Sequence, residues 1–195
     1  MNAVMRLGWT KDTPPDRTLV EVWYINTIIL AYHDAQGWRT ADGQHKKFFD
    51  IAAKASRNAT CNRANCGTVI VKNGKILGEG WNSPPQNNEE RRTCNGDYDY
   101  TKKPRYDLTC CIHAEWKAIL NACKNFGHDI EGSTLYFMRT DADGNFMNAG
   151  EPYCTVCSRL AMEAGVTKYI VMNDNVVEIY DIAKYDRASY SYHLK

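Results

Sequence analysis

CIHAEWKAIL, residues 111–120, has the pattern of a core helix but begins with side chains that a core helix does not need. Apolar residues recur at helical spacing and predict one buried face: Ile112, Trp116, Ile119, Leu120 and Cys123. His113 and Glu115 nevertheless fall in what would be the first turn, directly after two cysteines. A histidine, a carboxylate and thiols together at one helix start indicate a role other than packing, and the rest of the sequence indicates which role.

A second group of candidate ligands lies in EPYCTVCSRLAMEAG, residues 151–165. Cys154 and Cys157 are three positions apart at a predicted helix start, so both sulfurs can point the same way. A helix N-terminus also favours the thiolate form that binds metal. If this helix start meets that of residues 111–120, His113 becomes the third ligand. Three protein ligands and a fourth position left to water are the arrangement of a catalytic zinc.

Glu115 follows His113 by two positions and is not needed as a ligand. A free carboxylate beside metal-activated water can accept its proton and return it elsewhere. H-x-E together with P-C-x-x-C resembles the signature of the zinc nucleobase deaminases. Each motif alone is weak, because H-x-E is common on exposed helices and C-x-x-C also occurs in structural zinc sites, redox pairs and cores. Their combination on two helix starts favours a deaminase.

The order of predicted elements indicates an α/β protein with a mixed sheet covered by helices. Asn73-Gly74 between two apolar runs predicts a hairpin, and residues 83–109 are polar and are interpreted as an insertion. The other predicted elements are helices at 18–35, 45–56, 111–125 and 154–164, and strands at 134–140 and 167–172. We expect an N-terminal extension over residues 1–44, with the helix at 18–35, and a deaminase domain over 45–195.

Composition limits the classes of partner. The chain has 195 residues and a net charge of +1 without a basic tail, which argues against a large nucleic-acid footprint. The N-terminal segment MNAVMRLGWTKDTPPDR lacks the apolar region of a signal peptide, and no apolar run is long enough to cross a bilayer, so we expect a cytoplasmic protein without membrane contact. In a reducing compartment, its eight cysteines indicate metal binding or catalysis rather than disulfides.

Four segments resemble the deoxycytidylate (dCMP) deaminase family of the cytidine deaminase superfamily: TCNRANCGTVIVKNGKILGEGWNSPP, HAEWKAI, IEGSTLYF and CTVCSRLAMEAGV. The resemblance covers about residues 45–172. It implies a three-layer α/β/α fold and hydrolysis of dCMP to dUMP and ammonia with one catalytic zinc. The matching positions are His113, Cys154 and Cys157 as zinc ligands, Glu115 as proton shuttle, and Asn82 and the Ala114 backbone as substrate contacts.

The chain departs from the family pattern at several positions. Pro152 stands one residue earlier than usual, so Tyr153 is expected to line the pocket differently. Ser83 and Lys117 occupy positions where the family often has Gly and Asn. The segment before Cys154 is also longer. We therefore expect these departures to affect the choice of substrate more than the chemistry. Among the basic residues, Arg105 is our candidate for the substrate phosphate because Arg forks suit phosphate.

Four further cysteines allow two interpretations: Cys61, Cys94, Cys110 and Cys111. They could hold a second, structural zinc that stabilises the polar insertion, which the resemblance to the dCMP deaminase family implies for some members. Alternatively, some of them are small buried core residues.

Two other classes of function are compatible with the same motifs. A tRNA adenosine deaminase or another cytosine nucleoside or nucleotide deaminase would share the motifs. A zinc-stabilised binding module without turnover would share the ligands but would have no use for Glu115. The resemblance also implies a homo-oligomer and allosteric control by dCTP and dTTP.

Overall fold

The computed structural model describes residues 44–94, 109–174, 176–192 and 194, together with the backbone of residues 4–7, 18–24, 27–34 and 37–39. Its main sheet has six strands, five of which follow the order β10-β9-β7-β5-β6, while β8 pairs with β7. The strands are β5 (Asn65–Lys72), β6 (Lys75–Trp81), β7 (Thr134–Thr140), β8 (Phe146–Met147), β9 (Lys168–Asn173) and β10 (Val176–Asp181). Because β7 and β9 are parallel and the other pairs antiparallel, the sheet is mixed.

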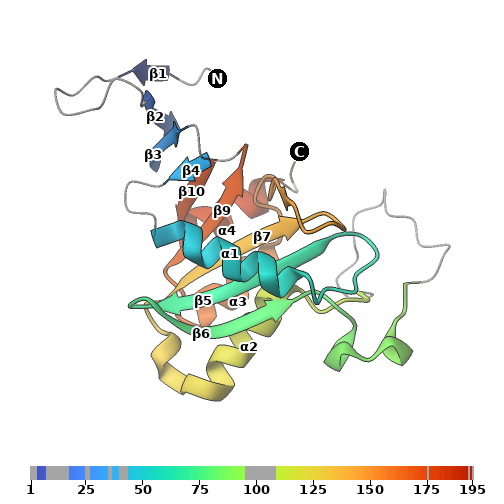
Figure 1. Ribbon diagram of the computed structural model, residues 1–195. Helices are drawn as coiled ribbons and strands as arrows, with labels where there is room; N and C mark the ends of the chain where they lie inside the picture. Colours follow the sequence, from blue (N-terminus) through green and yellow to red (C-terminus); the bar gives the residue numbers. More distant parts are fainter. Residues whose placement is uncertain are drawn as a thin grey trace.

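Helices cover both faces of this sheet (Figure 1). One face carries α1 (Gln44–Ser56), and the other carries α2 (Ala114–Phe126), α3 (Thr155–Glu163) and α4 (Ile182–Tyr192). Strand β5 divides its side chains between the two cores, since Val69 packs with α1 and Ile70 with α2. Buried side chains on both faces of a central strand give three layers. The predicted three-layer α/β/α fold is therefore confirmed.

Most of the predicted elements occur at their predicted places. The β5–β6 hairpin turns at Asn73 and Gly74, whose φ angles of 51° and 76° are the left-handed values that such a turn requires. The helices near 45–56, 111–125 and 154–164 and the strands near 134–140 and 167–172 are α1, α2, α3, β7 and β9. Strand β10 was not predicted. Three short 3-10 turns complete the described elements: Pro85–Asn87, Glu89–Arg91 and Gly127–Ile130.

The predicted helix over residues 18–35 is wrong. This region instead contains two antiparallel strands, β2 (Thr18–Tyr24) and β3 (Thr27–Asp34), within a four-stranded sheet that also contains β1 (Val4–Leu7) and β4 (Gly37–Arg39). The physical reason is composition. The segment is dense in Val, Ile, Thr, Tyr and Trp, whose branched or aromatic side chains favour strands over helices. The division into an extension and a domain stays a prediction.

The predicted insertion at 83–109 and the predicted phosphate contact Arg105 lie partly or wholly outside the described residues. Only residues 83–94 and 109 of the expected insertion belong to them, and Arg105 lies outside. Among the described helices, none combines the length and the apolar character that crossing a bilayer requires.

Helix α2 lies unusually close to β6 because two glycines face it. A Cβ atom at Gly80 would overlap the carbonyl oxygen of Ala114, and one at Gly78 would overlap that of Ala118. Both helix positions are fully buried. The absence of side chains at these two strand positions therefore sets the depth at which the first turn of α2 sits on the sheet.

Replacing Gly80 with alanine is expected to push the start of α2 away from β6. Overpacking of this kind costs about 1–3 kcal/mol of unfolding free energy, which thermal or urea unfolding would measure. Glu79→Ala is the matched control, because it adds an alanine to the same strand at an exposed position. Equal stability of the Gly80→Ala variant and the wild type would contradict the close contact.

Candidate active site

The starts of two helices meet at the centre of the candidate site. His113 is the N-cap of α2 and Cys154 is the N-cap of α3. Nδ1 of His113 lies 3.1 Å from Sγ of Cys157 and 3.5 Å from Sγ of Cys154. Across the part of the chain that the structure describes, this is the only group of three metal-ligating side chains whose donor atoms come within 4.8 Å of one another. The expected convergence of the two helix starts is thus present.

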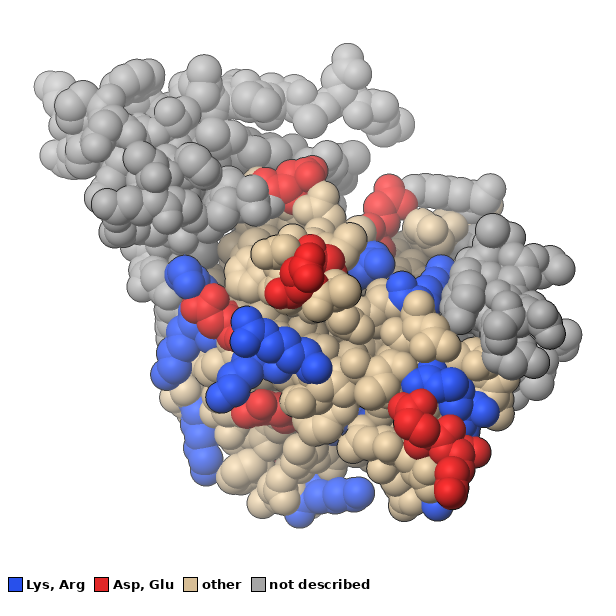
Figure 2. All heavy atoms as spheres, turned by 45° about the vertical axis from the view of Figure 1, so that its right-hand side comes forward, with Lys and Arg blue, Asp and Glu red and all other residues tan. Residues whose placement is uncertain are grey.

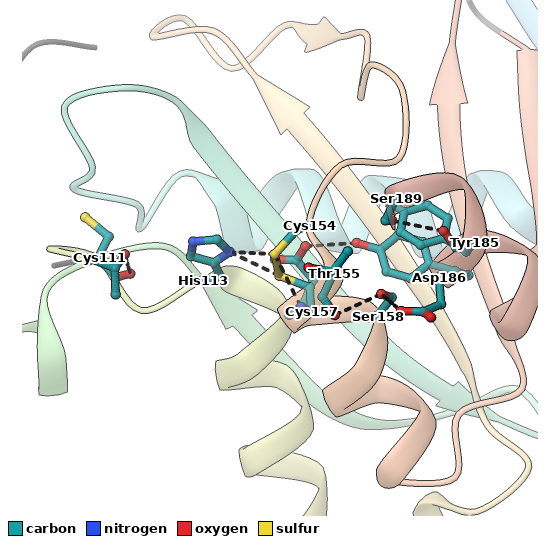
Figure 3. Close-up of a disulfide and its surroundings, with 12 residues drawn as sticks. Cys111, His113, Cys154, Thr155, Cys157, Ser158, Tyr185, Asp186 and Ser189 are labelled. Carbon is teal, nitrogen blue, oxygen red and sulfur yellow. Dashed lines mark hydrogen bonds between the residues drawn. A yellow bond between two sulfur atoms is a disulfide. The ribbon is translucent and has the colours of Figure 1, made fainter. Parts of the chain in front are cut away.

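The two cysteines of this group face each other at the first turn of α3. Their sulfurs form a disulfide (Figure 3), and the Cys157 backbone N–H donates to Sγ of Cys154 at 3.3 Å. The disulfide was not expected from the sequence. One imidazole nitrogen and two sulfurs are a donor set that zinc accepts, provided that the pair is reduced, because metal binds thiolates. The helix N-terminus stabilises that charged form.

Neighbouring side chains fix the orientation of both helix starts. The His113 ring stacks on Trp116 with a centroid distance of 4.8 Å and an interplanar angle of 17°. In α3, the buried Ser158 hydroxyl is 3.1 Å from the Thr155 carbonyl and donates to Oδ1 of Asp186, on α4, at 2.7 Å. Figure 3 shows the Ser158–Asp186 contact beside the two cysteines. Helix α4 therefore holds the start of α3 in place.

Glu115 lies in the first turn of α2 and is almost entirely buried, with 5% of its surface exposed. The Tyr169 hydroxyl, from β9, donates to Oε1 of Glu115 at 2.9 Å. Burial raises the pKa of Tyr169 well above its usual value, and the Glu115 charge raises it further. Tyr169 therefore keeps its proton and remains a hydrogen-bond donor to the carboxylate.

A cavity of about 510 Å³ opens beside the helix starts. Its lining includes His113 and Glu115 and three of the four predicted substrate contacts, Asn82, Ala114 and Tyr153. The Asn82 side-chain amide is hydrogen-bonded to the backbone before β5. Its Oδ1 accepts from the Cys66 N–H at 2.8 Å, and its Nδ2 donates to the Ala64 carbonyl at 2.7 Å. Ala114 is fully buried, and the Tyr153 ring lies 6.2 Å from that of Tyr192.

Two arginines line the same cavity and were not singled out in the sequence. They are Arg63, from the segment before β5, and Arg139, near the end of β7. Nε of Arg139 is buried and has no hydrogen-bond partner among the described residues. The one signal in the sequence for Arg139 was its place as a cationic residue near the end of the strand that precedes the C-x-x-C helix. Only the fold, however, places it in the cavity.

Two departures from the family pattern contact each other. Nζ of Lys117 donates to Oγ of Ser83 and, at 2.7 Å, to Oδ1 of Asn87. The ammonium also lies 5.7 Å from the centroid of the Trp81 ring. Burial lowers the Lys117 pKa. Lys117 thus joins α2 to the segment after β6 and does not line the cavity.

The four cysteines of the predicted second zinc site line the other end of the cavity. Cys61 lies beside Cys111, and Cys94 lies beside Cys110. The Thr93 backbone N–H also donates to Sγ of Cys110 at 3.2 Å. Among the described residues, no three of these sulfurs come as close together as the donors of the first group. The second zinc site and the alternative of buried free thiols both stay predictions.

Comparisons with known proteins extend these observations. Residues 42–173 match the family model described as the cytidine and deoxycytidylate deaminase zinc-binding region. The deoxycytidylate deaminase of Mycobacterium phage D29 is 29% identical over 133 residues, which are 63% of this chain and 89% of that protein.

Solved structures also resemble the chain. The dCMP deaminase of cyanophage S-TIM5 in complex with dCMP and dUMP has a TM-score of 0.48 and 24% identity, over 67% of this chain and 82% of that one. For the cytidine deaminase of Mycobacterium leprae the TM-score is 0.44 and the identity 17%, over 73% and 97% of the two chains.

Alkylation should distinguish the thiols that line the cavity. The hydrogen bond from Cys111 lowers the pKa of Cys61 to about 5, whereas burial raises that of Cys66 to about 12. Because the thiolate is the reactive form, we expect iodoacetamide at roughly pH 6 to modify Cys61 and to spare Cys66, as read by peptide mass spectrometry.

Treatment with a chelator is the control for this prediction. Cys61 that reacts only after chelation would indicate a bound metal, as in the second zinc site that the sequence suggested. Cys61 that stays unmodified with and without the chelator would contradict its lowered pKa.

Proposed function

This chain belongs to the cytidine and deoxycytidylate deaminase family, and from that premise we propose that it catalyses the zinc-dependent hydrolysis of dCMP to dUMP and ammonia. The family expected from the sequence motifs is thereby confirmed. The observation that carries the proposal is the meeting of His113, Cys154 and Cys157 beside a buried carboxylate, at the wall of a cavity.

His113, Cys154 and Cys157 are the proposed zinc ligands. When bound, zinc lowers the pKa of a coordinated water and so supplies a nucleophile at neutral pH. The positive ends of α2 and α3 stabilise the two thiolates, and Trp116 holds the imidazole ring. These three residues would hold the metal and would leave room for water beside it.

Glu115 is the proposed proton carrier. Hydrolysis of cytosine forms a bond between water oxygen and C4 and breaks the bond from C4 to the exocyclic nitrogen. The proton from the water has to reach N3, and a further proton has to reach the leaving amine. Glu115 is placed for both transfers, because it lines the cavity two residues after His113 and is shielded from bulk water.

The two arginines of the cavity support a nucleotide over a nucleoside as substrate. Arg63 and Arg139 are the only Lys or Arg side chains among its described lining residues, and Nε of Arg139 has no hydrogen-bond partner within the described part of the chain. A guanidinium group suits a phosphate because it can donate two parallel hydrogen bonds. The phage D29 relative is a deoxycytidylate deaminase, which agrees with a monophosphate substrate. Asn82, Ala114 and Tyr153 are the proposed contacts to the rest of the nucleotide.

Surface charge gives no support to a nucleic-acid substrate. On the described part of the face in Figure 2, basic and acidic side chains alternate without a broad basic field. Control by dCTP and dTTP, a homo-oligomeric assembly, a cytoplasmic location and a role of Arg105 remain predictions from the sequence.

Removing the Glu115 carboxylate should separate metal binding from catalysis. We expect Glu115→Ala to lower ammonia release from dCMP by about 10²–10⁴-fold, the usual contribution of general acid–base catalysis, while it retains zinc. In contrast, His113→Ala should lose zinc as measured by metal analysis of the reduced protein. A Glu115→Ala variant that also loses zinc would make Glu115 a ligand or a structural support. Wild-type protein that is active on cytidine or an adenosine-34 tRNA stem-loop, and inactive on dCMP, would overturn the substrate.

Arg139 is expected to contribute to binding of the phosphate of dCMP and not to binding of its cytosine base. We expect Arg139→Ala to raise KM for dCMP by roughly tenfold or more, the loss of a charge-assisted hydrogen bond, and to leave turnover of cytidine unchanged. Arg91→Ala is the control, because Arg91 is exposed and lies outside the cavity lining. An equal loss on dCMP and cytidine would show that Arg139 supports the fold instead.

A further inference from the structure

Catalysis by a carboxylate depends on where its two oxygens point, and one oxygen of Glu115 has a fixed partner. Among the described residues, the Tyr169 hydroxyl is the only hydrogen-bond partner of this carboxylate, at 2.9 Å from Oε1. The contact joins strand β9 to the first turn of α2 and connects residues that are 54 positions apart. Neither sequence motif contains Tyr169.

Tyr169 is itself held rigidly. Only 1% of its surface is exposed, and its ring stacks on Tyr185 of α4 with a centroid distance of 3.7 Å and an interplanar angle of 9°. Tyr180 packs edge-on against Tyr185 from β10 at 5.4 Å. The aromatic group formed by Tyr169, Tyr180 and Tyr185 therefore leaves the Tyr169 hydroxyl little freedom to leave Glu115.

This geometry has a consequence for proton transfer. A carboxylate can move a proton between water, ring nitrogen and leaving amine through one oxygen that reaches all three in turn. A hydrogen bond from Tyr169 to Oε1 restrains rotation of the carboxylate and leaves Oε2 as the transferring oxygen. Tyr169 supplies this restraint as a neutral group, so it adds no charge to the buried site.

We propose that Tyr169 is a positioning residue for the deamination, acting through Oε1 of Glu115. The inference rests on the proposed function, since it assigns Glu115 the proton transfers described above. Tyr169 touches neither the nucleotide nor the metal in this scheme. Its removal therefore changes the rate of the chemical step and leaves substrate binding as it was.

The test compares Tyr169→Phe with Tyr180→Phe. The first removes the hydroxyl that reaches Glu115 and keeps the stacked ring, whereas the second removes a hydroxyl of the same aromatic group that donates to Glu178 at 2.7 Å. With dCMP as substrate and rates expressed per bound zinc, we expect Tyr169→Phe to lower kcat by about tenfold with KM unchanged. Tyr180→Phe should retain wild-type kcat and KM.

Thermal unfolding gives a readout that does not depend on activity. We expect Tyr169→Phe to lower Tm in the wild-type background and to be neutral or stabilising in a Glu115→Ala background, where the hydroxyl has lost its partner. The same shift in both backgrounds would show that the two groups are not coupled, and would overturn the inference.

The kinetic outcomes separate the two proposals. An active wild type with unimpaired kcat in Tyr169→Phe overturns the positioning role alone. Loss of zinc, or a rise in KM that accompanies the fall in kcat, assigns Tyr169 a structural role and also overturns it. A wild-type protein with zinc bound and no activity on dCMP overturns the proposed function, and the positioning role in this reaction with it.

Discussion

The meeting of two helix N-termini is the arrangement on which the rest of the site depends. Each N-terminus carries a partial positive charge, so bringing two of them together is unfavourable unless negative charge lies between them. Reduced Cys154 and Cys157 and the carboxylate of Glu115 provide such charge. The positive helix N-termini favour the thiolate forms of Cys154 and Cys157. Those thiolates can in turn bind a divalent cation. In the reduced protein, the negative charge of the two thiolates therefore stabilises the packing of the helix starts as well as metal binding.

Holding the two helix starts together requires support from distant parts of the chain. The sheet supports α2 at close range because Gly78 and Gly80 present no side chains to it. Helix α4 supports α3 through Asp186 and Ser158. The Ser83–Lys117 contact adds a further link between α2 and the segment after β6. This last link joins two of the positions at which the sequence departs from the family pattern, Ser83 and Lys117, so these two departures are one change in physical terms.

Local patterns predicted the parts of the structure that local physics determines. Asn73-Gly74 specified a hairpin, and the apolar spacing after His113 and Cys157 specified two helices with their ligands at the start. The segment 18–35 failed because its apolar residues fit helical spacing, while their branched and aromatic side chains favour the strands that are present. Arg139 and Tyr169 could not be assigned, because each reaches the site through strand order and register, which no short motif encodes. Cysteine spacing likewise could not show that Cys61 lies beside Cys111 and Cys94 beside Cys110.

The contact between Asp186 and Ser158 has a consequence for the order of folding. Helix α4 follows every proposed zinc ligand in the chain, and it contributes both Asp186 and the Tyr185 ring that packs on Tyr169. During synthesis, His113, Cys154 and Cys157 therefore leave the ribosome before the helix that orients them. Contacts of such sequence separation form late, because the entropy of closing the intervening loop has to be overcome first. The final geometry of the two thiols and the imidazole is therefore complete only after α4 has been synthesised and has packed on α3.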